Sequence, residues 1–313
     1  MKIALVFPGQ GSQSVGMLGS LAESFSQVRE TYQEVSDALD YDLWKLVQNG
    51  PEEELNKTHI TQPAMLASGI AVWRIWQNLG GSIPVAMAGH SLGEYSALVC
   101  AGSISLRDAA LLVQERGRFM QEAVPSGVGA MAAILGLDDD VVIKICSRAA
   151  ENEVVSAVNF NSPGQVVVAG NTSAVERAVD LAKEAGAKRA VILPVSVPSH
   201  CSLMMPAADR LAERLATIEI STPSIPVYNN VDVKAEEDPD AIRTALKRQL
   251  FSPVRWVDTI NMFAEQGVLH IVECGAGKVL AGLNKRINRD MKAYTTQDKD
   301  SLQKAVEAVK GEE

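Results

Sequence analysis

Short apolar segments alternate along this chain with segments of helical periodicity. Ile3–Phe7, Val85–Ala88 and Leu269–Val272 have the length and composition of buried strands, and a glycine-containing stretch follows each of them. Apolar residues recur at spacings of three and four in three segments: after Ser91, between Leu106 and Ala123, and between Ala207 and Ala216. Strands and helices that alternate in this way predict an α/β protein.

Residues 126–198 carry a pattern of their own. The expected order is strand, helix, strand, strand, helix, strand, at Ala130–Leu135, Asp139–Ala150, Val154–Asn159, Gln165–Ala169, Ala174–Ala185 and Arg189–Val195, with a turn at 161–164. This βαββαβ order is the ferredoxin-like arrangement. We therefore predict a small ferredoxin-like domain at 126–198, inserted into a larger domain made of 1–125 and 199–313. The polar stretch 232–241 is expected to be a surface loop.

The composition excludes several classes of protein. Of 313 residues, 47% are hydrophobic and 21% are charged, so the chain can bury a large core and is not disordered. The net charge of −9 argues against binding to nucleic acid or to an anionic membrane surface. The longest apolar run, near Ala64–Trp73, has about ten residues, whereas a membrane-spanning helix needs about 20.

The cysteines and the N-terminus indicate where the protein works. Cys100, Cys146, Cys201 and Cys274 share no short spacing, so they fit neither a disulfide framework nor a CxxC metal site. The apolar run at Ile3–Phe7 is shorter than the roughly seven to fifteen residues of an export signal. We expect a cytoplasmic protein with reduced thiols and no bound metal.

The strongest motif is Gly89-His90-Ser91-Leu92-Gly93, a G-x-S-x-G sequence between an expected strand and an expected helix. A sharp turn in this context lifts the serine hydroxyl above the end of a sheet, and the glycines avoid clashes inside the turn. The backbone N–H groups at the start of the helix favour a developing oxyanion. Ser91 is therefore a candidate nucleophile.

A serine nucleophile needs a base, and the chain contains only four histidines. His90 adjoins Ser91, His59 lies in a polar stretch, and His270 alternates with apolar residues inside an expected strand. His200 follows a strand and the turn Pro198-Ser199, so it lies in a loop, where catalytic residues concentrate. By elimination His200 is the leading candidate for the base, although an ordinary loop histidine is the alternative. No acidic residue stands out as the third member of a catalytic triad with Ser91 and His200.

A second glycine-rich loop, Phe7-Pro8-Gly9-Gln10-Gly11-Ser12-Gln13, follows the first strand. It is not a Walker A loop because no Gly-Lys-Ser/Thr follows, and it matches only the start of a dinucleotide fingerprint. In α/β enzymes with a serine nucleophile, a strand-end loop of this kind supplies the second oxyanion donor. We favour this interpretation.

Arg116 borders the apolar stripe of a predicted helix. Ser105 and Asp108 are expected to form a capping box at its start. The stripe consists of Leu106, Ala109, Ala110, Val113, Gly117 and Met120. An arginine at the edge of a buried stripe needs an anionic partner, and a substrate carboxylate is the functional interpretation. A structural ion pair or a snorkelling side chain is the alternative.

Five motifs together resemble one family. They are the loop at 7–13, the serine motif extended to Gly89-His90-Ser91-Leu92-Gly93-Glu94-Tyr95-Ser96-Ala97, Arg116-Gly117, the stretch at 159–165, and Val197-Pro198-Ser199-His200. In this order and spacing the chain closely resembles the bacterial malonyl-CoA:acyl carrier protein transacylases of type II fatty acid synthesis. The resemblance covers residues 3 to about 290. It implies an α/β-hydrolase-like large domain with a ferredoxin-like domain inserted, in agreement with the pattern at 126–198.

The resemblance also implies the role of each site residue. Ser91 is the acylated nucleophile and His200 is its base, while the N–H groups of Gln10 and Leu92 form the oxyanion hole. Arg116 binds the free malonyl carboxylate. A backbone carbonyl near Gln249 orients the histidine, with Asn230 close by; both belong to the expected substrate site. Malonyl-CoA is then a substrate and no cofactor is needed.

The expected partners are malonyl-CoA, CoA and acyl carrier protein, and we expect a monomer. Because the carrier protein and this chain are both acidic, their attraction must be local. Lys188-Arg189 and Lys285-Arg286, with Arg289, are the basic clusters that could dock it; an ordinary solvated face is the alternative. Two other functions remain open, a serine hydrolase or thioesterase and a noncatalytic carrier-protein scaffold.

Overall fold

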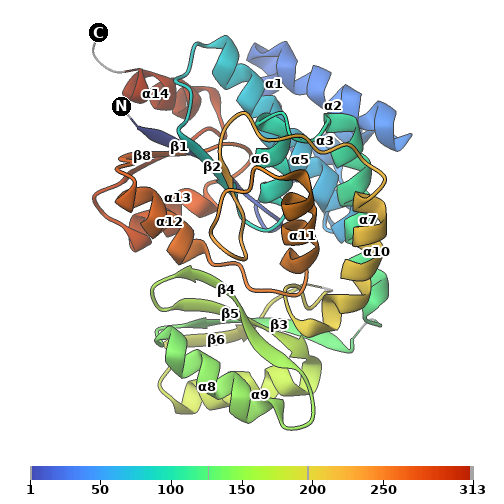
Figure 1. Cartoon of the computed structure of the whole chain (residues 1–313), viewed down its shortest axis with the longest axis vertical. Helices are drawn as coiled ribbons and strands as arrows, with labels where there is room; N and C mark the ends of the chain where they lie inside the picture. The colour runs from blue at the N-terminus through green and yellow to red at the C-terminus, as the bar shows by residue number, and fades with distance from the viewer. Residues whose placement is uncertain (1, 126, 196, 311–313) are drawn as a thin grey trace.

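The computed structural model describes residues 2–125, 127–195 and 197–310 and has a mixed α/β fold with two separate sheets (Figure 1). Within these residues a five-stranded sheet has the order β7-β2-β1-β8-β9, and a four-stranded sheet has the order β4-β5-β3-β6. Every strand pair of the first sheet is parallel and every pair of the second is antiparallel. The strands are β1 Ile3–Phe7, β2 Ala86–Gly89, β3 Gly129–Leu135, β4 Val155–Ser162, β5 Gln165–Asn171, β6 Arg189–Ile192, β7 Val227–Tyr228, β8 His270–Glu273 and β9 Lys292–Thr295.

The three strands predicted for the larger part, β1, β2 and β8, form the centre of the parallel sheet. Successive residues of β1 face opposite sides: Ile3, Leu5 and Phe7 join one hydrophobic core, while Ala4 and Val6 join another. Burial on both faces explains why these strands are apolar throughout.

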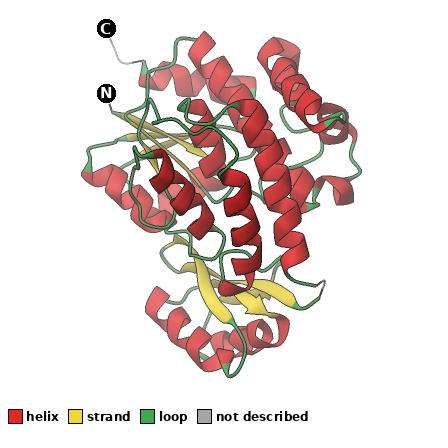
Figure 2. Ribbon diagram, turned by 45° about the vertical axis from the view of Figure 1, so that its right-hand side comes forward, coloured by secondary structure: helices red, strands yellow, loops and turns green. Residues whose placement is uncertain are grey.

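Helices cover both faces of this sheet, as Figure 2 shows in red. α5 and α7 pack with α2 on one side, and α12 and α13 contribute to the core on the other. The helices are α1 Gly19–Ser24, α2 Ser26–Leu39, α3 Leu43–Asn49, α4 Glu52–Leu55, α5 Thr58–Asn78, α6 Gly93–Cys100, α7 Leu106–Ala123, α8 Asp139–Ala150, α9 Thr172–Glu184, α10 Met205–Leu215, α11 Pro239–Gln249, α12 Trp256–Glu265, α13 Val279–Ile287 and α14 Lys299–Val309, with a 3₁₀ turn at Ser202–Met204. No helix among the described residues is long and apolar enough to cross a bilayer.

The predicted βαββαβ order of the antiparallel part is confirmed. β3, α8, β4, β5, α9 and β6 follow one another, and one face of their sheet forms a core with α8 and α9 that draws all its buried members from residues 130–190. In Figure 1 these two helices lie on the side of the sheet that faces away from the rest of the molecule. The other face carries Met131, Val158 and Val167 and packs with Cys201.

Some expected boundaries shift. β4 continues to Ser162, which pairs with Gln165, so the expected turn at 161–164 shortens to Pro163-Gly164, with Gly164 at a φ of 70°. β6 ends at Ile192, although it was expected to reach Val195, because its last pairing with β3 is Ile192 with Ala132. The domain boundaries stay a prediction, and residues 1, 126 and 313 among them lie outside the described residues.

Two local predictions need correction. The stretch 232–241 is not a loop to its end, because α11 begins at Pro239 and the Asp238 side chain caps it by accepting from the N–H of Ala241. The capping box of α7 is only half formed. Ser105 accepts from the N–H of Asp108, but the Asp108 carboxylate accepts from the Ser105 hydroxyl and not from a backbone N–H.

Candidate active site

Ser91 lies in the sharp turn between β2 and α6. Its φ is 51°, a left-handed conformation that serine rarely adopts, and strain of this kind concentrates at functional sites. A Cβ atom on Gly89 would collide with the backbone of Gly93, and one on Gly93 would collide with the backbone of Phe7. The glycines therefore let the turn pack directly on the end of β1, which confirms the predicted strand–turn–helix context.

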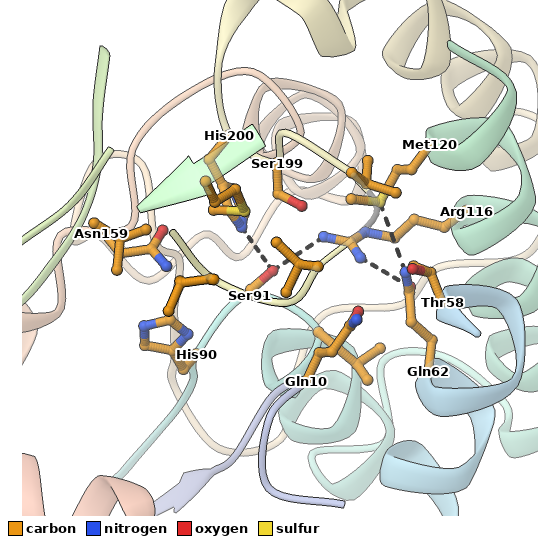
Figure 3. A pocket seen from close by; sticks show the side chains of 16 residues that line it. Gln10, Thr58, Gln62, His90, Ser91, Arg116, Met120, Asn159, Ser199 and His200 are labelled. Carbon is orange, nitrogen blue, oxygen red and sulfur yellow. Dashed lines mark hydrogen bonds between the residues drawn. The ribbon is translucent and has the colours of Figure 1, made fainter. Parts of the chain in front are cut away.

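His200 lies next to the serine. Its Nε2 is 2.8 Å from Ser91 Oγ (Figure 3). Its Nδ1 is 2.7 Å from the backbone oxygen of Gln249. Because a carbonyl oxygen can only accept, Nδ1 carries the proton and Nε2 is left to accept from the serine hydroxyl. The histidine itself has a φ of 67°, and its N–H donates to the oxygen of Leu250 at 2.9 Å. The loop thus fixes both the position and the tautomer of the imidazole.

Burial keeps this imidazole neutral. His200 is 4% exposed, and its burial, together with the nearby Arg116 charge, lowers its pKa to about 3. A neutral imidazole can take the serine proton, whereas an imidazolium cannot. The orienting group is a backbone carbonyl, which explains why no acidic residue stands out in the sequence as a third member.

The other three histidines lie elsewhere. His59 Nδ1 contacts Gln121 Oε1 at 2.7 Å from the first turn of α5, and His270 contacts the Tyr294 hydroxyl at 3.1 Å inside β8. His90 lines the same pocket as Ser91, but its Nε2 contacts Asn161 Oδ1 at 2.8 Å and its ring packs on Trp256. Among the described residues His200 alone places an imidazole nitrogen on Ser91, as elimination predicts.

Arg116 is more deeply buried than its place on the stripe indicates. It is 1% exposed and its Nη2 is 3.2 Å from Ser91 Oγ. Its other partners are neutral oxygens, Gln62 Oε1 at 2.8 Å and Gln249 Oε1 at 3.0 Å. In the described part of the chain no carboxylate oxygen lies within 4.0 Å of this guanidinium, and its Nε has no hydrogen-bond partner.

A buried cation with only neutral partners is suited to receive an anion. Nε and Nη2 form one edge of the guanidinium plane, and a carboxylate can bind such an edge with two parallel hydrogen bonds. One nitrogen of this edge, Nη2, already contacts the serine oxygen, so the edge begins at the nucleophile. The structural ion pair considered from the sequence is therefore not found among the described residues, and the substrate-carboxylate alternative remains.

Asn230 and Gln249 lie behind the serine turn and are not among the residues that line the pocket. The Asn230 side chain accepts from the N–H of Ser91 at 2.7 Å and donates to the oxygen of Gly89 at 2.6 Å. The Gln249 side chain donates to the oxygen of Ser91 at 3.1 Å and accepts from Arg116. The two residues therefore support the serine turn from the side away from the pocket, and their expected place among the substrate contacts stays a prediction.

The two candidate oxyanion donors lie side by side. Gly9, the neighbour of Gln10, packs on the serine turn so closely that a Cβ on it would be 2.5 Å from the oxygen of His90 and 3.7 Å from the nitrogen of Leu92. In the described chain neither the Gln10 N–H nor the Leu92 N–H donates a hydrogen bond to another residue. Both residues line the pocket that contains Ser91. This arrangement leaves both N–H groups available for an oxyanion.

The pocket lies between the two sheets. It measures about 690 Å³ including its open mouth. Ser91, His200 and Arg116 form its polar side, as Figure 3 shows, and apolar residues of the antiparallel part complete it, namely Met131, Val167, Leu193 and Val195. Such a pocket can hold the acyl end of a substrate, with its long remainder leaving through the mouth.

The two basic clusters lie at one end of the antiparallel sheet. Arg286 Nη1 donates to Gln165 Oε1 at 2.9 Å, and Gln165 pairs through Leu135 of β3 with Arg189 of β6. Lys188, Lys285 and Arg289 are exposed, as are the two arginines. Arg189 and Arg286, which are far apart in the sequence, thus lie at the same end of this sheet.

Sequence reasoning missed several residues of the site. Gln62 on α5 contacts Arg116, Glu94 on α6 contacts both Gln249 and Asn230, and Asn161 contacts His90. Two signals in the sequence could have located two of them. Glu94 comes directly after the serine motif, and Gln62 is a polar residue inside an apolar run.

Comparisons with known proteins identify the family. A family model described as an acyl transferase domain matches residues 4–299. The malonyl CoA-acyl carrier protein transacylase of Escherichia coli strain K12 is 60% identical over 306 residues, which cover 98% of this chain and 99% of that protein. The chain belongs to the malonyl CoA-acyl carrier protein transacylase family. The transacylase of Bacillus subtilis strain 168 is 43% identical over 312 residues, covering 99% of this chain and 98% of that protein.

Solved transacylase structures have the same fold. A transacylase from Coxiella burnetii is 50% identical, with a TM-score of 0.98 over 99% of this chain and 98% of its own. A malonyl-transacylase in complex with its type II PKS acyl-carrier protein is 58% identical, with a TM-score of 0.97 over 98% of this chain and 100% of its own. The mixed α/β fold of this chain is therefore that of the transacylase family.

Proposed function

We propose that this chain transfers a malonyl group from malonyl-CoA to the phosphopantetheine thiol of acyl carrier protein. The observation that carries the proposal is that Ser91 Oγ contacts both His200 Nε2 and the guanidinium of Arg116, a buried arginine without a carboxylate partner among the described residues. The names of the transacylase relatives and the carrier-protein complex of one of them support it.

The first half of the reaction forms an ester on Ser91. Ser91 Oγ attacks the thioester carbon of malonyl-CoA while His200 Nε2 takes the hydroxyl proton. The oxyanion of the tetrahedral intermediate accepts from the N–H groups of Gln10 and Leu92, each of which contributes about 3–4 kcal/mol. The C–S bond then breaks, and His200 returns its proton to the departing CoA sulfur.

The second half runs in the opposite direction. The carrier-protein thiol attacks the malonyl ester as His200 takes its proton, and the C–O bond to Ser91 breaks with that proton returning to Oγ. This is a ping-pong mechanism through a malonyl-serine ester. No step changes an oxidation state, so the reaction calls for no redox cofactor, and malonyl-CoA acts as substrate only.

Arg116 selects the substrate. The Nε and Nη2 edge of the guanidinium binds the free malonyl carboxylate, which releases Ser91 Oγ for attack. Acetyl-CoA has no carboxylate, so it leaves this edge unpaired. The unpaired buried arginine also favours the transferase over a serine hydrolase or thioesterase, because a hydrolase of neutral acyl groups gains nothing from such a cation.

The exposed basic surface at Lys188, Arg189, Lys285 and Arg286 docks the acidic carrier protein, with Arg289 at its margin. A local positive surface on a chain of net charge −9 gives the carrier protein one favourable orientation. The antiparallel sheet that carries half of this surface also lines the pocket.

We further infer that the large part is an α/β-hydrolase-like domain and that 126–198 is a ferredoxin-like one. The strand order β4-β5-β3-β6 of the antiparallel sheet, with two helices on one face, supports the second description. We propose that the protein works as a monomer in the cytoplasm. It binds no nucleic acid, no membrane and no metal in its reaction.

The test is a transfer assay with labelled malonyl-CoA and acyl carrier protein in its holo and apo forms. We expect labelled holo carrier protein, no label on the apo form, and, without carrier, a rapid release of one CoA per active site followed by slow turnover. Sustained fast CoA release over many turnovers in the absence of carrier protein would instead identify a hydrolase. No labelling of either form and no CoA release would identify a noncatalytic scaffold.

A further inference from the structure

Glu94 is a buried carboxylate that the mechanism above does not use. It lies in the first turn of α6, three residues after Ser91, and is 2% exposed. Among the described residues no Lys, Arg or His nitrogen lies within 4.0 Å of it. Burying a carboxylate without an ion-pair partner is costly, so its presence here calls for an explanation.

Both hydrogen bonds of Glu94 are made by a single oxygen. Its Oε2 accepts from the backbone N–H of Asn230 at 2.9 Å and from the Gln249 side chain at 2.8 Å. These two donors belong to different parts of the chain. Asn230 supports the turn that carries Ser91, and Gln249 supports Arg116.

The Gln249 amide has its orientation set by Glu94. A carboxylate oxygen that accepts requires the NH₂ side of the amide to face it, which turns Oε1 toward Arg116. In the reversed orientation the NH₂ group would face the guanidinium, and two donors would oppose each other. The same residue holds His200 through its backbone oxygen. Glu94, together with the backbone oxygen of Ser91, which accepts from the same NH₂ group at 3.1 Å, therefore keeps the Gln249 oxygen on Arg116.

The Asn230 backbone is the second point of attachment. Its side chain holds the strained serine turn from both ends, because it accepts from the N–H of Ser91 and donates to the oxygen of Gly89. Fixing the Asn230 N–H to Glu94 fixes the starting point of this side chain. One carboxylate oxygen is thus connected to the nucleophile by one path and to the anion-binding arginine by the other.

We propose that Glu94 is the positioning residue of this active site, which aligns Ser91 through Asn230 and Arg116 through Gln249. The inference rests on the proposed function. It assigns Glu94 an effect on the rate of serine acylation and on the malonyl-over-acetyl preference, without contact to the substrate.

Packing alone is the competing explanation, and the chain offers a matched control for it. Leu98 lies one turn further along α6, is 3% exposed, and lines the same small cavity as Glu94 between α6, β7 and α11. It makes no side-chain hydrogen bond. Leu98→Ala therefore removes packing at this place and leaves the polar connections intact.

The experiment compares wild type, Glu94→Ala, Glu94→Gln and Leu98→Ala in single-turnover acylation by malonyl-CoA and by acetyl-CoA, with thermal unfolding of each protein. We expect Glu94→Ala to slow malonyl acylation about tenfold to a hundredfold, as small misplacements in active sites do, and to narrow the malonyl-over-acetyl preference. Glu94→Gln keeps an oxygen that accepts from both donors, so it should stay within about threefold of wild type. Leu98→Ala should lower the Tm and leave acylation per folded molecule unchanged.

Three results would overturn the inference. The first is a folded Glu94→Ala protein that is acylated with the rate and the malonyl-over-acetyl preference of wild type. The others are a Leu98→Ala or a Glu94→Gln protein whose acylation is as slow as that of Glu94→Ala. If Glu94→Ala does not fold, Glu94→Asp replaces it. The shorter side chain keeps the charge but does not reach both donors, so slow acylation supports the inference and a wild-type rate refutes it. Wild-type protein that forms no malonyl adduct would refute the proposed function itself.

Discussion

Replacing Arg116 by alanine tests the origin of substrate selection. Arg116 is 1% exposed, its Nε has no hydrogen-bond partner, and its Nη2 contacts Ser91 Oγ. A bound carboxylate therefore forms one new hydrogen bond with Nε, and on Nη2 it takes the place of the serine oxygen. A charge-assisted hydrogen bond contributes about 1.5–3 kcal/mol. A net loss of about 3 kcal/mol corresponds to a decrease of about a hundredfold in kcat/KM for malonyl-CoA.

Acetyl-CoA provides the internal reference for this prediction. It makes no contact with the carboxylate-binding edge, so Arg116→Ala should change its acylation far less and reduce the malonyl-over-acetyl ratio by about two orders of magnitude. The assay is competitive acylation by the two thioesters, read from the masses of the protein adducts. Arg118→Ala is the matched control, because Arg118 lies on the same helix with its side chain 54% exposed and only a 3.9 Å contact to Glu115. An Arg116→Ala protein that keeps the wild-type malonyl-over-acetyl ratio would refute the assignment of Arg116.

Three further predictions concern the base, the docking surface and Glu94. His200→Ala should lower the rate of acylation by about 10²–10⁴-fold in stopped-flow measurements of CoA release, and a smaller loss would mean that another group takes the proton. Charge reversal by Lys285→Glu with Arg286→Glu should raise the KM for carrier protein while leaving acylation by malonyl-CoA unchanged, and an unmoved KM would place docking elsewhere. Burial raises the pKa of Glu94 from 4.5 to about 7, so the stability that its bound proton contributes is complete below pH 4.5 and is lost as the pH rises through about 7. Relative to wild type, Glu94→Gln should therefore gain about 3 kcal/mol in free energy of unfolding between pH 4.5 and pH 8, and equal urea midpoint differences at both pH values would contradict this.

The local part of the site is predictable from the sequence because its signals are local. β2 ends in Gly89, and Gly9 follows two residues after the end of β1 at Phe7. The serine turn also needs glycines at fixed offsets, so Ser91 and the Gln10 loop can be located from residue types alone. The position of His200 follows by elimination because the chain has few histidines. α7 has a clear polar and apolar side, which gives its bounds and the unusual place of Arg116.

The remainder has no such signal. α5 is buried on nearly every side, so its apolar residues show no helical periodicity, and β7 and β9 are too short or too exposed to be read as strands. The group that orients His200 is a backbone carbonyl, which any residue type could supply. Glu94, Asn230 and Gln249 meet across more than 130 residues of sequence, and only the folded chain shows that they share one set of hydrogen bonds.

The intact mass of the protein after mixing with malonyl-CoA tests most directly whether Ser91 carries the malonyl group. We expect one malonyl adduct on wild type, none on Ser91→Ala, and loss of the adduct when holo carrier protein is added, with the malonyl group recovered on the carrier. An adduct that forms equally on Ser91→Ala, or one that is lost to water as quickly as to the carrier protein, would contradict the proposed transfer.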